Sequence, residues 1–141
     1  MITANLSAIP TYEEWRHAAR NMLAVAAAPE MVTWRTQGET DLFASACTPN
    51  LQPATQISVP RTFMEMAERA VLHADLERFA LLYRVLWRLQ TNKHLMEDPA
   101  DRDVGRLSAM SKAVSRDQHK MHAFVRFREV GRESKSHFVA W

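Results

Sequence analysis

Residues 76–90 constrain the fold of this chain more than any other segment of the sequence. Apolar side chains occupy nearly every face of a helix built from them, and the polar residues form one narrow stripe of Glu77, Arg84 and Arg88. A helix that is apolar on most faces belongs at the centre of a domain, because every face must be covered. We therefore expect a single core around this helix, with Asp75 as its N-terminal cap.

The two arginines on that helix need carboxylate partners if they are half-buried. We expect Arg84 and Arg88 to pair with Glu77, Asp41 or Glu39, which would tie a long loop to the central helix. The alternative is that both arginines hold a phosphate at the domain surface.

Composition agrees with one domain of residues 1–141. The chain has 141 residues, of which 47% are hydrophobic, and a domain of this length buries about two-thirds of its unfolded surface. No run approaches the roughly 20 apolar residues of a membrane span. Residues 1–10 lack the features of a secretory signal. A single cysteine, Cys47, cannot form an internal disulfide, so we expect a cytoplasmic protein.

Periodicity and capping signals predict an α+β fold with about four helices and a small antiparallel sheet. The helices are expected over residues 11–28, 61–74, 76–90 and 101–121, the first opened by a capping box of Thr11 and Glu14. Strands are expected over residues 31–36 and in a C-terminal hairpin, residues 123–130 and 137–141 around a turn at 131–136. Residues 1–10 are a leader or a short strand, and residues 37–56 are a long loop with at most a brief strand at 41–44. Residues 57–59 are a candidate for a further strand.

The last expected strand, residues 137–141, is apolar and has no polar tail after it. Edge strands are usually blunted or covered. We therefore expect residues 1–141 to be the N-terminal part of a longer polypeptide.

Charge is distributed unevenly along the chain. Residues 111–141 hold seven Lys or Arg against three acidic residues, a balance of +4, whereas the whole chain carries only +2. Such an asymmetry suggests an anionic partner. Basic residues recur on one face of the fourth helix and continue onto the following strand with an aromatic residue between them. The candidate nucleic-acid-binding residues are Lys112, Arg116, His119, Lys120, Phe124, Arg126 and Arg128.

These residues suit the backbone of a nucleic acid, where charge supplies much of the affinity. Phe124 beside the two strand arginines could stack on an unpaired base. In the alternative interpretation Phe124 packs under a neighbouring element, and the arginines are solvated or paired with Glu129.

No catalytic centre, metal site or cofactor site is predicted. His119 and His122 are three residues apart, but zinc needs two further ligands, and no spacing requires Cys47 or His137 in that role. Cys47 has no basic neighbour in sequence that would lower the pKa of its thiol. An enzyme that uses the two histidines and the loop of residues 37–56 is a third hypothesis, with little to support it.

Four stretches together resemble a bacterial domain of unknown function that is found near DNA-repair genes: residues 31–35, 75–89, 115–128 and 137–141. In many members this domain is fused in front of a uracil-DNA glycosylase of the uracil-binding, cross-linking (UdgX) type. Stand-alone relatives are similar to a DNA-metabolism protein that accompanies a radical-SAM enzyme. The glycosylase's uracil pocket lies in the other domain, so no catalytic residue is carried over.

The resemblance implies an accessory DNA-binding or positioning module of a DNA-repair protein. DNA and a C-terminal glycosylase domain or a radical-SAM protein would be its partners. The alternative is a protein-interaction domain that docks a partner repair or radical-SAM enzyme without touching DNA.

Overall fold

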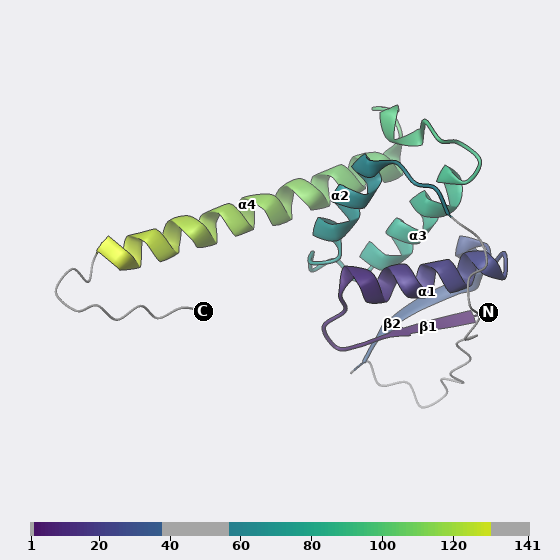
Figure 1. Ribbon diagram of the computed structural model, residues 1–141, viewed down its shortest axis with the longest axis horizontal. Helices are drawn as coiled ribbons and strands as arrows, with labels where there is room; N and C mark the ends of the chain where they lie inside the picture. The colour runs from purple at the N-terminus through teal and green to yellow at the C-terminus, as the bar shows by residue number, and fades with distance from the viewer. Residues whose placement is uncertain (1, 38–56, 131–141) are drawn as a thin grey trace.

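The computed structural model describes residues 2–37 and 57–130, with residues 123–130 described as backbone only. Its elements follow the order β1 (Ile2–Leu6), α1 (Tyr12–Ala24), η1 (Pro29–Met31), β2 (Val32–Thr36), α2 (Arg61–Ala70), α3 (Arg78–Leu89), η2 (Leu95–Glu97) and α4 (Arg102–Val130). The strands and the first three long helices form one body, and α4 projects from it (Figure 1).

The sheet in the described residues is parallel, so the expected antiparallel sheet is wrong. β1 and β2 pair in register from Ile2 opposite Val32 to Leu6 opposite Thr36. Parallel neighbours need a crossover connection, and α1 supplies it here. A helix between the two strands returns the chain to the end of the sheet where β1 began, so β2 must run in the same direction.

The start of α1 is close to the prediction. The Thr11 hydroxyl oxygen accepts a hydrogen bond from the Glu14 backbone N–H at 3.2 Å, as a capping residue does. The Glu14 carboxylate does not close the capping box, because it accepts instead from the hydroxyl and backbone N–H of Ser7. It thereby fixes the turn between β1 and α1.

The end of α1 comes earlier than the sequence predicts. Ala26 has a φ of 51°, in the left-handed region, and its N–H donates to the Leu23 carbonyl at 3.0 Å. The Ala27 N–H donates to the Met22 carbonyl, also at 3.0 Å. This pair of bonds is a Schellman motif, which normally places glycine at the left-handed position. The helix therefore stops without a glycine or a proline at its end.

α3 is the centre of the core, as the sequence predicts. Seven of its side chains are buried: Phe79, Leu81, Leu82, Tyr83, Val85, Leu86 and Leu89. The buried Tyr83 hydroxyl donates to the Ala27 carbonyl at 2.6 Å, and burial raises the pKa of this phenol. The hydroxyl therefore stays protonated and ties α3 to the segment after α1.

Aromatic side chains connect the elements around α3. The rings of Tyr12, Trp15, Trp34, Tyr83 and Trp87 follow one another with centroid separations of 5.6 to 6.4 Å. Contacts at this range favour tilted or offset rings and add to the energy of burial. The series joins α1, β2 and α3 into one core.

α4 is one continuous helix where the sequence predicts a helix over residues 101–121 and a strand over residues 123–130. The backbone is helical to Val130, so the predicted strand over residues 123–130, and with it the C-terminal hairpin, is wrong. Residues 106–130 contain neither glycine nor proline, so nothing local ends the helix. The alternation of apolar residues was too short to decide between the two periods. The expected turn at 131–136, the strand at 137–141 and the brief strand at 41–44 lie outside the described residues.

Within residues 2–37 and 57–130, no helix combines the length and the apolar character that crossing a membrane requires.

Candidate nucleic-acid interface

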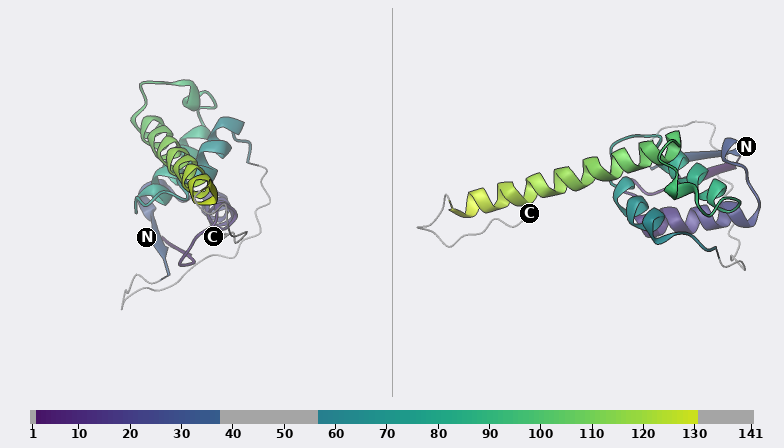
Figure 2. Two further views of the ribbon diagram at one scale, coloured as in Figure 1. Left: turned by 90° about the vertical axis from the view of Figure 1, so that its left-hand side faces the viewer. Right: turned by 90° about the horizontal axis from the view of Figure 1, so that it is seen from above.

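α4 has two parts with different surroundings. Its first part packs on α2 and α3 through a stripe of buried residues: Val104, Leu107, Met110, Ser111 and Val114. Every residue from 115 to 122 is exposed. Figures 1 and 2 show this part of α4 extending away from the body. We call residues 115–122 the projecting segment.

Ion pairs attach the start of α4 to α3. Arg84 binds Asp103 with two hydrogen bonds of 3.0 and 2.9 Å, in the bidentate geometry that suits a guanidinium and a carboxylate. Arg88 binds Asp101 at 2.6 Å and also reaches Asp103 at 3.3 Å. These contacts fix the base of α4 on the central helix.

Carboxylate partners for the two arginines are therefore confirmed, but the expected partners are not. Glu77 instead binds Arg106 of α4, at 3.1 Å. Asp41 and Glu39 lie outside the described residues. Within the described residues both guanidinium groups thus have carboxylate partners, as the first interpretation predicts, and each arginine side chain is 42% exposed.

Asp101 also caps α4. Its Oδ1 accepts hydrogen bonds from the backbone N–H groups of Asp103 and Val104, at 3.0 and 3.1 Å. The hydrogen bond from Arg88 lowers the pKa of Asp101, and the same bond raises the pKa of Arg88. One ionised carboxylate thus begins α4 and attaches it to α3.

The basic residues predicted on the helix share one face of α4. Lys112, Arg116, His119 and Lys120 are all exposed. At about 100° per residue they fall within an arc of about 100°, roughly half a turn away from the buried stripe. We call these four residues the basic face. It points away from the side of α4 that packs on the body.

No carboxylate among the described residues pairs with the basic face. Arg116 donates to the Lys112 carbonyl at 3.4 Å, a bond within the helix that leaves its charge uncompensated. In the described part of the chain no ion pair involves Lys112, Arg116 or Lys120. The face is therefore open to an anionic partner.

The three residues predicted on a strand lie on the helical backbone of α4. Arg126 and Arg128 would share a face of a strand, but two residues on a helix are about 200° apart. By register, Arg126 comes two turns after His119, Phe124 comes one turn after Lys120, and Arg126 and Arg128 do not share a helix face.

The described residues form no metal site. His119 and His122 are exposed on the projecting segment, and no group of three or more His, Cys, Asp or Glu in residues 2–37 and 57–130 could hold a metal ion. Cys47 and His137 lie outside this part of the chain.

The roles of Asp101 and Asp103 were missed from the sequence. Asp101 precedes α4 and Asp103 is in its first turn, where aspartate often caps a helix. Arg84 and Arg88 are in the last two turns of α3, the preceding long helix. The connection between the two helices is short enough to bring these residues together. That combination is the signal that could have identified the ion pairs.

Comparison with known proteins gives one match. No curated protein and no solved structure matches the chain at a significant level. Residues 76–141 match the profile of a protein family described as a domain of unknown function, DUF4130. The match covers α3, η2 and α4, the elements that carry the ion pairs and the basic face, and it supports the resemblance to a domain of unknown function.

Proposed function

We propose that this chain is an accessory module that binds the DNA backbone through the basic face of α4 and positions a bacterial DNA-repair enzyme of the uracil-DNA glycosylase kind. One observation carries the proposal: Lys112, Arg116 and Lys120 are exposed together on the side of α4 that points away from the body. All three can therefore meet one polyanion at once.

The dimensions of the face suit a phosphate backbone. Residues 112–120 span about 12 Å along the helix axis, which equals the axial rise of three to four phosphates on one strand. Three cations give modest, salt-dependent and sequence-independent binding. Such binding suits a module that holds an enzyme near DNA and leaves recognition to the enzyme.

The accessory role rests on the resemblance. It connects the chain to repair proteins in the cytoplasm of bacteria, and the match over residues 76–141 agrees with the domain-of-unknown-function part of that connection. The described residues assemble no group of metal ligands. In this proposal the reaction belongs to a C-terminal glycosylase domain or to a separate partner, as the resemblance implies.

Fluorescence anisotropy with labelled single- and double-stranded DNA tests the proposal. The variant Lys112→Gln/Arg116→Gln/Lys120→Gln should bind more weakly. The slope of log K against log salt should become shallower by about 2.7 for double-stranded DNA and about 2.1 for single-stranded DNA. The control Arg61→Gln/Arg69→Gln/Lys93→Gln removes the same charge from exposed positions on the body. It should keep most of the affinity. Equal losses in both variants, or no binding by the unaltered chain at low salt, would reject the proposal.

A second candidate function is docking of a partner protein. The apolar stripe of α4 continues by register from Val114 to Met121, which is 63% exposed. A single exposed apolar residue is ordinary on a protein surface, but Met121 extends the buried stripe of α4, and an amphipathic helix face of this kind can be covered by another helix or domain. Purified glycosylase or radical-SAM partner should then bind the chain without DNA, and Met121→Glu should weaken that binding while Lys120→Gln does not.

A further inference from the structure

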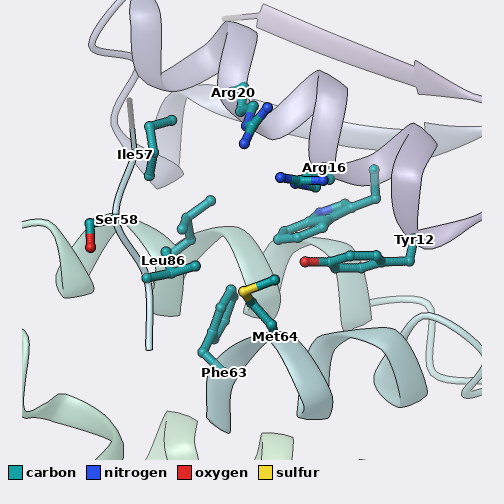
Figure 3. Close-up of a pocket in the computed structure, with 10 residues that line it drawn as sticks. Tyr12, Arg16, Arg20, Ile57, Ser58, Phe63, Met64 and Leu86 are labelled. Atoms are coloured by element: carbon teal, nitrogen blue, oxygen red, sulfur yellow. The ribbon is translucent and has the colours of Figure 1, made fainter. Parts of the chain in front are cut away.

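Two adjoining cavities lie on the body, away from α4. The first has a volume of about 220 Å³ and is walled mainly by α1, α2 and residues 57–59 (Figure 3). The second has a volume of about 320 Å³ and lies between the end of α1 and the end of α3. Arg20 and Ile57 line both. Small-molecule sites occupy roughly 300 to 1,000 Å³, so the two cavities together have the size of one such site.

α1 contributes the polar groups of the first cavity. Tyr12, Arg16 and Arg20 follow one another at intervals of four residues and therefore share a helix face. Figure 3 shows the Tyr12 hydroxyl and the Arg16 guanidinium directed toward the same space, with Arg20 further along α1. Ser58 lies across that space. Burial raises the pKa of Tyr12, so its hydroxyl remains a hydrogen-bond donor at neutral pH.

The described lining of the two cavities carries positive charge. None of the described residues that line them is a carboxylate, although Glu68 and Glu13 lie near enough to Tyr12 to contribute to raising its pKa. Within the described residues, Arg20 is half-buried and takes part in no hydrogen bond or ion pair. In the same part of the chain Arg16 has one acidic partner, Glu13, at 3.3 and 3.4 Å, and the Glu13 side chain is 74% exposed. Arginine is seldom buried without an anionic partner, and none of the described residues supplies one to Arg20, which makes this guanidinium a candidate for binding an anionic ligand.

The remaining walls are aromatic and apolar. Trp15, Phe63 and Leu86 line the first cavity with Met64, and Trp87 lines the second. Trp15 and Phe63 are only 1% exposed, so the ring surface that a ligand could meet belongs mostly to the partly buried Tyr12 and Trp87. Aromatic walls favour a flat ring, which stacks on them or meets them edge-on. Inorganic phosphate would leave these walls uncovered, and a purely apolar ligand would leave Arg20 without a counter-charge.

We propose that the two cavities form one binding site for a nucleoside monophosphate, with the phosphate held by Arg16 and Arg20 and the base against the aromatic wall. Arginine binds phosphate through two parallel N–H groups, which suits a phosphate at the junction where Arg20 lines both cavities. Tyr12 and Ser58 supply hydrogen bonds to the base or sugar. None of the lining residues belongs to α4, so this site does not depend on the proposed function.

An NMR titration of the isotopically labelled full chain tests the site with three probes: deoxyadenosine monophosphate, deoxyadenosine and inorganic phosphate. The nucleotide should produce saturable shifts in the backbone amides of Arg16, Arg20 and Ser58. Loss of the charged hydrogen bonds should make deoxyadenosine bind about tenfold more weakly or worse. Inorganic phosphate alone should shift these amides least.

Two variants separate the phosphate contact from the base contact. Arg20→Gln should weaken the nucleotide about tenfold and leave deoxyadenosine unchanged, because only the phosphate loses its partner. Met64→Trp should fill the first cavity and weaken both. The control Arg61→Gln alters an exposed arginine that lines neither cavity, and it should bind like the unaltered chain.

The proposal would be overturned if the nucleotide gave no saturable shifts at concentrations up to about 10 mM. A dissociation constant above that value would be too weak for a functional site. Shifts confined to Lys112, Arg116 and Lys120 would also overturn it, because they would mark phosphate binding on α4 instead. If Arg20→Gln weakened the binding of nucleotide and nucleoside equally, Arg20 would not be the residue that binds the phosphate.

Discussion

Arg88 in α3 and Asp101 at the start of α4 are joined by two hydrogen bonds, of 2.6 and 3.1 Å. The same Asp101 carboxylate accepts two backbone N–H groups of α4. Asp101 therefore both begins α4 and joins it to α3, beside the Arg84–Asp103 pair and the buried stripe of α4. Whatever binds the projecting segment depends on this attachment for its position relative to the core.

Asp101→Ala should lower the free energy of unfolding by about 2 kcal/mol. Loss of the cap costs about 1 kcal/mol. Loss of the bond to Arg88 adds about 1 kcal/mol, a modest value because the Arg88 side chain is 42% exposed. Asp101→Asn keeps the cap and should cost about 1 kcal/mol. Urea denaturation measures both, with Asp117→Ala on the projecting segment as a control expected to stay within about 0.5 kcal/mol. Equal costs for the two Asp101 variants would contradict the division into cap and ion pair.

Stability should fall in acid because of the same carboxylate. Arg88 lowers the pKa of Asp101 in the folded state, so the folded protein binds this proton less readily than the unfolded chain does. The contribution is complete above the unfolded pKa of about 3.9 and is lost as pH falls through the folded pKa. Urea midpoints measured from pH 6 down to acid should fall less steeply below about pH 4 in Asp101→Asn than in the unaltered chain. Parallel curves for the two proteins would be the contrary result.

Ala26→Gly should raise the free energy of unfolding by about 1 kcal/mol. Ala26 has a φ of 51°, and a left-handed residue with a Cβ costs roughly 1 to 2 kcal/mol, which exceeds the added entropy of glycine in the unfolded chain. Ala28→Gly is the matched control, since Ala28 has a φ of −63° and gains nothing from glycine. The control should be destabilised. Thermal denaturation of both variants shows whether the free energy of unfolding rises in Ala26→Gly and falls in Ala28→Gly.

Gly105→Ala should stabilise α4 by about 0.5 to 1 kcal/mol. Gly105 is exposed within the helix, and a Cβ added there meets no atom within 4 Å. The reverse change at Ala113, further along α4, should cost a similar amount. Chemical denaturation measures the effect. If Gly105→Ala destabilised the protein, a side chain at this position would have to contact other atoms, contrary to the structure.

Hydrogen exchange should show a step in protection along α4. Leu107 and Met110 are buried against the body, so their amides open only with the core, whereas Arg116 and His119 are in a segment stabilised by helix propensity alone. We expect exchange at Arg116 and His119 to be at least about 100-fold faster, which corresponds to roughly 3 kcal/mol of opening free energy. Uniform protection across the step would show that a second molecule covers the projecting segment.

Several features could be predicted from residues alone. The apolar faces of residues 76–90 required burial on all sides, and α3 is indeed central. The basic residues of the fourth helix are spaced so that they share one helix face, and the structure shows all four exposed: Lys112, Arg116, His119 and Lys120. The strand over residues 123–130 could not be predicted correctly, because a short alternating run satisfies a helix equally well when no glycine or proline interrupts it. The cavities beside Arg20 carry no sequence motif, since their walls come from four separate segments.

The sequence by itself thus determined which residues are buried and which faces are charged, because hydrophobic and charge periodicity are properties of local helix and strand geometry. Only the tertiary structure decided the partners. The crossover through α1 made β1 and β2 parallel, the return of the chain after η2 gave Arg84 and Arg88 to Asp103 and Asp101, and packing of α1 beside α2 gathered Arg16 and Arg20 over an aromatic wall. Periodicity states that a side chain needs a partner, but the path of the chain in space decides which residue supplies it.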